Sequence, residues 1–133
     1  MENRIAAQLN NKGFTLIEFL VALVILTVGL LGLLQTVNYA LSHNLQNQLR
    51  NEAVMVADAE MAKELSKGYD LVDITTSNYV VTRQVLKAAK DYTVTRSGSA
   101  LQNSKKVDFV ITWQYKNAQY THGASAVISK TNQ

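Results

Sequence analysis

The apolar residues of this chain gather in one long run near its start. From Phe14 to Leu34 the run is broken only by two threonines, two glycines and a single charge, Glu18. A helix rises about 1.5 Å per residue, so this run spans roughly 30 Å, the thickness of a bilayer's hydrocarbon core. No other stretch is comparable. The pattern predicts a helix that lies in a membrane or in an equally dry assembly.

Beyond Leu34 the apolar residues recur at steps of three, four and occasionally five, which indicates one face of a continuous helix. Lys67-Gly68 predicts its end, with a cation in the last turn and a glycine for a left-handed cap. We therefore expect one helix from about Phe14 to Lys67, whose second half, residues 35–67, is amphipathic and lies against a globular head. A coiled coil is the alternative, but a strict heptad is absent. The expected stripe comprises Val37, Leu41, Leu45, Leu49, Ala53, Val56, Met61 and Leu65.

Residues 68–133 have the pattern of a small antiparallel β head. The clearest strand alternates apolar and polar residues from Val107 to Tyr115. One face of such a sheet is able to cover the helical stripe, so the predicted fold class is α+β. Beside a loop at 69–76, the expected elements are strands at 78–86, 91–96, 107–115 and 119–129, with turns at Ser97-Gly98-Ser99 and Lys116-Asn117-Ala118.

Glu18 is the one charge within the apolar run. A carboxylate in hydrocarbon costs several kcal/mol and is rarely kept without a partner. One interpretation is that the side chain snorkels to the headgroups. The other is that it awaits a cation, which is supplied after the chain is processed or when it meets a neighbour.

The residues around Glu18 resemble a known processing site. Gly13-Phe14-Thr15-Leu16-Ile17-Glu18, behind a short polar leader that ends at Lys12, is similar to the processing site of type IV pilin precursors and type II secretion pseudopilins. The resemblance implies that a prepilin peptidase cleaves after Gly13 and methylates the new amine of Phe14. It also implies that Glu18 neutralises the Phe14 amine of a neighbouring subunit. An uncut single-pass anchor is the competing interpretation.

The same resemblance implies a structural subunit rather than an enzyme, of the PilV kind of minor pilin or the GspI kind of minor pseudopilin. Residues 1–13 would be a cytoplasmic leader, held there by Arg4 and Lys12. Residues 14–34 would span the bacterial inner membrane once and later form the filament core, with the head in the periplasm. The subunit would then move from the membrane into a pilus or pseudopilus, which could place it at the cell surface. The expected partners are the peptidase and other pilin subunits. The alternative class is a membrane-anchored module that binds DNA or a surface ligand.

Small residues in the apolar run leave two interpretations open. Gly29 and Gly32 each weaken the helix by about 1 kcal/mol relative to alanine. They would let the segment stretch or melt in a filament, or they would allow neighbouring helices to approach closely. The family commonly has a proline a little beyond this region, where this chain has Gln35.

Composition excludes several kinds of chemistry. The chain has no cysteine, so disulfides and thiolate sites are excluded. Its net charge of +3, which falls to +2 without the leader, is too small to indicate nucleic-acid binding. His43 and His122 lack the spacing of a metal or catalytic site, and no metal or cofactor is expected. A solvated loop is favoured over a calcium site for Asp70 and Asp73. For the basic residues, solvated surface is likewise favoured over a DNA-binding face; these are Lys87, Lys90, Arg96, Lys105 and Lys106. For the tyrosines and Trp113, packing is favoured over an electron relay.

Overall fold

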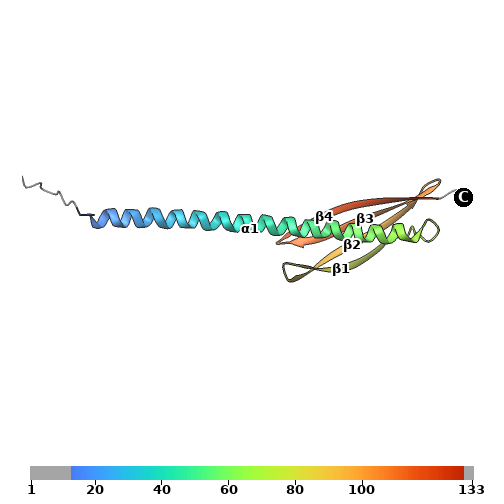
Figure 1. The fold of residues 1–133 in the computed structure, drawn as a ribbon, viewed down its shortest axis with the longest axis horizontal. Helices are drawn as coiled ribbons and strands as arrows, with labels where there is room; N and C mark the ends of the chain where they lie inside the picture. The colour runs from blue at the N-terminus through green and yellow to red at the C-terminus, as the bar shows by residue number, and fades with distance from the viewer. Residues whose placement is uncertain (1–12, 131–133) are drawn as a thin grey trace, which may run out of the picture. The chain divides into compact units, whose positions relative to one another are not determined.

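A computed structural model describes residues 13–130 of the chain. Within this range one helix, α1 (Leu16–Lys67), is followed by four antiparallel strands (Figure 1). The predicted α+β class is therefore confirmed. The predicted leader, except for Gly13, lies outside the described residues. The strands are β1 (Ser77–Val85), β2 (Ala88–Ala100), β3 (Ser104–Tyr115) and β4 (Ala118–Ser129).

The helix is continuous through both of its glycines and ends where the sequence predicts. Lys67 is its last residue, and Gly68 follows with a φ of 73°. Glycine adopts this left-handed conformation without steric cost, so Gly68 terminates the helix. The chain divides into two compact units between Leu41 and Ser42. The second unit contains residues 42–67 of α1 together with the sheet.

The sheet is a simple meander in the order β1-β2-β3-β4. Two-residue turns join β1 to β2 and β3 to β4, because Val85 pairs with Ala88 and Tyr115 pairs with Ala118. The strands run alongside the part of α1 that follows Ser42 (Figure 1). Consecutive strands of an antiparallel sheet need only such short connections, so this topology follows from the local turns.

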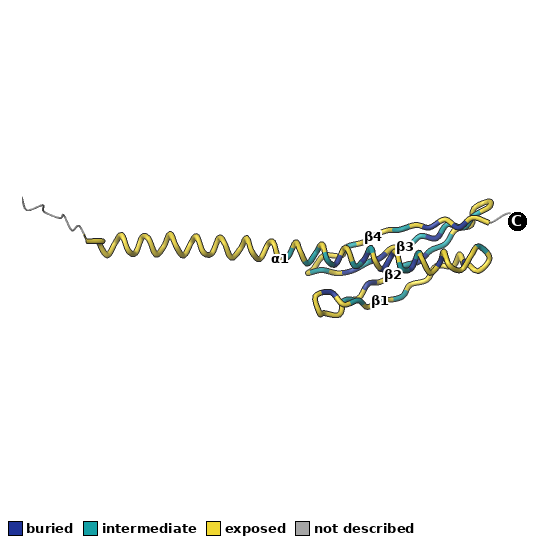
Figure 2. The backbone as a smooth tube through the Cα atoms, viewed as in Figure 1, coloured by how far each residue is buried: buried dark blue, intermediate teal, exposed yellow. Residues whose placement is uncertain are grey.

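The core of this unit lies between the helix and one face of the sheet. Burial alternates along β3, where Val107, Phe109, Ile111 and Trp113 point inward as predicted. Figure 2 shows buried positions, in dark blue, both on the part of α1 beside the strands and on the strands themselves. The Tyr92 hydroxyl donates to the Leu49 carbonyl over 3.1 Å and ties β2 to the helix. The helix contributes Leu49, Ala53, Val56 and Ala57 to the core.

The predicted helical stripe is wrong at both ends. Val37 and Leu41 are exposed, and so is Leu65 at 55%. In place of Leu65, the helix buries Glu60 and Glu64, which are 7% and 4% exposed. Steps of three and four residues from Ala57 reach these two glutamates, so they lie on the face that meets the sheet. Carboxylates are tolerated there because the sheet supplies their partners.

The predicted turn at residues 97–99 is also wrong, because β2 continues to Ala100. Gly98 pairs with Val107 in the middle of the ladder. A Cβ at Gly98 would lie 2.6 Å from the Cα of Ile74, closer than real contacts allow. The glycine is therefore required by close approach of the segment that joins α1 to β1, and not by a turn.

Candidate processing and assembly site

α1 begins with a capping box formed by Thr15 and Glu18. The Thr15 backbone N–H and hydroxyl both donate to Glu18 Oε2, over 2.8 and 3.0 Å, and the Glu18 N–H donates to Thr15 Oγ1 over 3.3 Å. This reciprocal bonding satisfies donors that the first turn of a helix leaves open. The Thr-x-x-Glu spacing is the sequence signal for this role of Glu18, which the prediction from charge alone missed.

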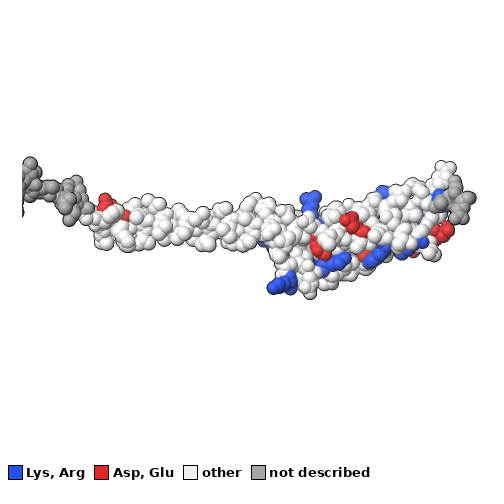
Figure 3. Space-filling model, viewed as in Figure 1, with Lys and Arg blue, Asp and Glu red and all other residues white. Residues whose placement is uncertain are grey.

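The cap does not neutralise Glu18. Both cap bonds end on Oε2, and within residues 13–130 no hydrogen bond or ion pair reaches Oε1. Residues 13–41 contain no lysine or arginine. In Figure 3 this part of the chain is white apart from an acidic group near its start. Glu18 is therefore a helix cap with one oxygen still open to a cation.

Gly13 and Phe14 precede the helix and are open on all sides. Phe14 is 87% exposed, and a Cβ built on Gly13 would meet no atom within 4 Å. The backbone of Gly13 does not adopt a positive φ. Nothing in the described part of this chain therefore requires glycine at position 13. A requirement for it has to come from a molecule that contacts the chain from outside.

The apolar residues from Phe14 to Leu34 are all exposed. α1 is the one helix in residues 13–130 that is long and apolar enough to cross a membrane, and its most apolar 18 residues, with a mean hydropathy of 2.7, have no buried share. Unbroken apolar surface of this extent needs a cover of lipid or of other subunits. The segment fits membrane anchoring.

A shallow hollow of about 280 Å³ lies on this helix beside Glu18. Its other lining residues are apolar and recur on one helical face. Ala22 is the smallest of them, so the hollow follows from a short side chain between longer ones. The hollow places an apolar surface directly next to the one charge of the segment. The lining consists of Ile17, Glu18, Val21, Ala22 and Ile25.

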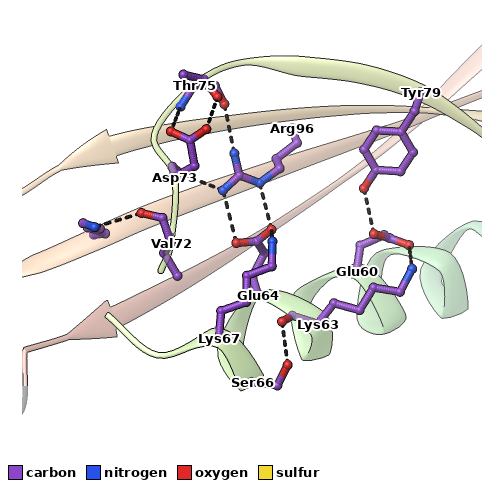
Figure 4. A network of polar contacts seen from close by, with 11 residues as sticks. Glu60, Lys63, Glu64, Ser66, Lys67, Val72, Asp73, Thr75, Tyr79 and Arg96 are labelled. Carbon is purple, nitrogen blue, oxygen red and sulfur yellow. Dashed lines mark hydrogen bonds and ion pairs between the residues drawn. The ribbon is translucent and has the colours of Figure 1, made fainter. Parts of the chain in front are cut away.

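A second polar cluster holds the segment that joins α1 to β1, residues 68–76 (Figure 4). Arg96 donates from Nε and Nη2 to the two oxygens of Glu64, over 3.0 and 3.1 Å. Its Nη1 donates to the Thr75 carbonyl over 2.9 Å, and Nη2 also donates to the Asp73 carbonyl. The Tyr79 hydroxyl donates to Glu60 over 2.7 Å. Each buried carboxylate of the helix therefore has a partner on the sheet.

The surroundings of this cluster shift the pKa values of Glu64 and Tyr79. Burial alone would raise the pKa of Glu64, but the hydrogen bonds from Arg96 and Lys67 outweigh it and lower the pKa. Burial and the bond to the Glu60 carboxylate raise the pKa of Tyr79. The cluster is saturated with internal partners. We therefore assign it to holding the 68–76 segment rather than to chemistry.

The basic residues do not form one surface. Arg96 is buried at Glu64, and Lys105 Nζ donates to the carbonyls of Tyr69 and Val72, each over 2.8 Å. The prediction that these basic residues form solvated surface is therefore wrong for Arg96, which is buried, and Lys105 is only half-exposed. Their actual role is local, because both hold the 68–76 segment.

The other candidate residues are not brought together. No group of three metal-ligating side chains exists among residues 13–130. The Asp73 carboxylate accepts from the Thr75 backbone N–H over 3.0 Å and from its hydroxyl, which makes a turn that needs no ion. Tyr92, Trp113 and Tyr120 pack in series at ring-centre distances of 6.1 and 5.9 Å. They belong to the core and its edge.

The chain was compared with protein families, curated proteins and solved structures. Residues 8–34 match the family model described as the prokaryotic N-terminal methylation motif. The comparisons with curated proteins and with solved structures gave no match. The matched residues include the exposed Gly13-Phe14 pair, the capped Glu18 and the apolar run to Leu34. The motif indicates a structural subunit that a prepilin peptidase processes and that assembles with other pilin subunits. This motif and the helix that carries it support a type IV pilin-like precursor.

Proposed function

We propose that this chain is a minor pilin or pseudopilin, cleaved after Gly13, methylated on the new Phe14 amine and assembled into a filament. The observation that carries the proposal is the open Oε1 of Glu18, which is the one charged side chain in the apolar run from Phe14 to Leu34. The cleaved chain supplies the missing cation, because each Phe14 amine is a positive charge at the start of the same segment. Pairing between subunits offsets the free-energy cost of placing the Glu18 carboxylate in an apolar environment.

The geometry next to Glu18 supports such a pairing. A neighbour's amine on Oε1 leaves the two cap bonds on Oε2 intact, since a carboxylate accepts several hydrogen bonds. The ring of the neighbour's Phe14 has an apolar surface to lie on in the hollow around Ala22. In a dry core such a charge pair is strong and sets the register of the subunits, because the local dielectric is low.

Before assembly, residues 14–34 anchor the chain in the inner membrane. The segment leaves the bilayer when neighbouring helices replace lipid as its cover. Close helix packing then compensates for the lost lipid contacts, and Gly29 and Gly32, which are open in this structure, permit close approach. The head stays in the periplasm and decides the position of the subunit and its partners.

A first experiment tests processing. We expect Gly13→Ala to block cleavage, so that the chain extracted from the native envelope still carries its leader. The wild-type chain should begin at Phe14 and carry one methyl group on its amine, as seen by mass spectrometry of the N-terminal peptide. Gly123→Ala is the matched control, since that glycine lies in β4 and far from the motif in sequence. A normally trimmed Gly13→Ala chain would refute the cleavage.

A second experiment separates the charge of Glu18 from its cap. Glu18→Gln removes the charge but keeps an acceptor for Thr15, since glutamine also serves in a capping box. Thr15→Val removes the side-chain part of the cap but keeps the charge. We expect Glu18→Gln to abolish incorporation into filaments and Thr15→Val to retain it, measured by the subunit content of sheared filaments. Equal incorporation of both variants would contradict the pairing.

A further inference from the structure

A pocket of about 420 Å³ lies in the head, between the helix and strands β3 and β4. One side is formed by Trp113 and Tyr120, a cross-strand pair whose rings stack at 5.9 Å and 22°. The other side is formed by helix positions 43, 46, 47 and 50. These positions lie on one helical face, because they are three and four residues apart. The volume is within the range of small-molecule sites.

The lining is rich in polar groups but has no acidic residue. Gln46 and Asn47 offer amides that both donate and accept, and Thr121 and Tyr120 offer hydroxyls. Arg50 adds a permanent positive charge. The buried indole Nε1 of Trp113 has no acceptor among residues 13–130, so a donor beside the pocket is also unused.

Arg50 differs from the other arginines that the structure describes. Arg83 Nε lies 3.7 Å from Glu52, and Arg96 forms its two-bond pair with Glu64. Arg50 has no hydrogen bond or ion pair within residues 13–130. Arg50 therefore lines the pocket with an unpaired guanidinium. Such a group is suited to receive a carboxylate from outside, since its planar fork matches that group.

We propose that this pocket binds a sugar ring that carries a carboxylate, of the uronic-acid class. The carboxylate pairs with Arg50, and the ring hydroxyls bond to Gln46, Asn47 and Thr121. The apolar face of the ring lies on the exposed part of the half-buried Tyr120. A simple aromatic acid would leave the amides and hydroxyls without partners, whereas a neutral sugar would leave Arg50 unpaired. The site is separate from the proposed pairing at Glu18.

The binding can be measured through Trp113, which is the only tryptophan of the chain and lines the pocket. The full chain is purified in a zwitterionic detergent without a sugar headgroup and titrated with glucuronate, glucose and acetate. We expect a saturable change in tryptophan fluorescence with glucuronate, a roughly tenfold weaker response to glucose, and none with acetate. Calorimetry with glucuronate and benzoate provides a second readout, in which benzoate should not bind.

Two variants test the assigned contacts. Arg50→Gln should bring the affinity for glucuronate down to that for glucose. Lys87→Gln removes the same charge outside the pocket and should change neither affinity. Thr121→Val keeps a β-branched residue at an exposed strand position, so the fold is retained, and it should weaken both sugars. Thermal unfolding of each variant confirms that the head is folded.

Four results would overturn the proposal. The first is the absence of a saturable response to glucuronate. The second is equal binding of acetate or benzoate, which would make this a general acid site. The third is an Arg50→Gln variant that still prefers glucuronate over glucose. The fourth is a larger response to an oligothymidylate than to glucuronate, which would indicate a nucleic-acid site. None of these results bears on cleavage at Gly13 or on the charge of Glu18, so the proposed function is tested separately.

Discussion

Arg96 of β2 and Glu64 of α1 form a two-bond ion pair whose side chains are 7% and 6% exposed. The same guanidinium bonds to the carbonyls of Asp73 and Thr75. One side chain thus joins the helix, the sheet and the segment between them. Because charges buried in this way are costly without their partners, the pair determines how the head responds to mutation and to acid.

We expect Arg96→Met to destabilise the head by about 3–5 kcal/mol, because it leaves the Glu64 carboxylate buried next to an apolar side chain. Adding Glu64→Leu to this variant should recover most of the loss, since a buried pair is often replaceable by apolar residues. The measurement is urea unfolding of the full chain in detergent, followed by Trp113 fluorescence. Lys63→Gln is the control, because the exposed Lys63 side chain should contribute less than about 1 kcal/mol. An Arg96→Met chain as stable as this control would contradict the role of the pair.

Acid should destabilise the head through Glu64. The folded-state pKa of this carboxyl is below its ordinary value of 4.5, so the unfolded chain binds the proton first as the pH falls. The stability from the ionised group is therefore complete above that value and is lost as the pH falls through the folded-state pKa. We expect the unfolding midpoint to fall steeply below about pH 4.5 in the wild type. Glu64→Gln should reduce this slope, and an unchanged slope would exclude Glu64 as its source.

Gly98→Ala should destabilise the head by about 1–3 kcal/mol, the usual cost of overpacking. The new Cβ would lie 2.6 Å from the Cα of Ile74 and 3.1 Å from the Asp73 carbonyl oxygen. The 68–76 segment would have to move and would lose bonds to Arg96. Gly123→Ala in β4 is the matched control, since its Cβ would meet nothing closer than 4.0 Å. Thermal unfolding should separate the two variants, and equal losses would show that close approach at Gly98 is unimportant.

The turn between β1 and β2 should be open to improvement. Leu86 and Lys87 have φ values of 49° and 66°, the left-handed conformation that a two-residue turn of this kind requires at both positions. Asparagine and glycine adopt it most easily. We expect Leu86→Asn combined with Lys87→Gly to stabilise the head by about 1 kcal/mol, measured by urea unfolding. Leu86→Val, which puts a β-branched residue there, should have the opposite effect, and the idea fails if both changes act in the same direction.

The sequence by itself determined the features that depend on local pattern. The apolar run from Phe14 to Leu34, the helix end at Lys67-Gly68 and the alternation along β3 are all short-range signals, and the structure confirms the helix end and the alternation. The processing motif could also be recognised from the sequence alone, because Gly13, Phe14 and Glu18 occur at fixed spacing. The capping role of Glu18 was also available from its distance to Thr15.

Only the tertiary structure decided which polar residues are buried and which glycines are needed. By residue type, Glu60 and Glu64 are expected in solvent and Leu65 in the core. In the structure the two glutamates are buried and Leu65 is exposed. The reason is that Arg96, which is 32 residues from Glu64 in sequence, lies opposite it only once β2 packs on the helix. Gly98 reads as a turn residue until the 68–76 segment is seen to pass over it. Such partners are distant in the chain, so no local pattern encodes them.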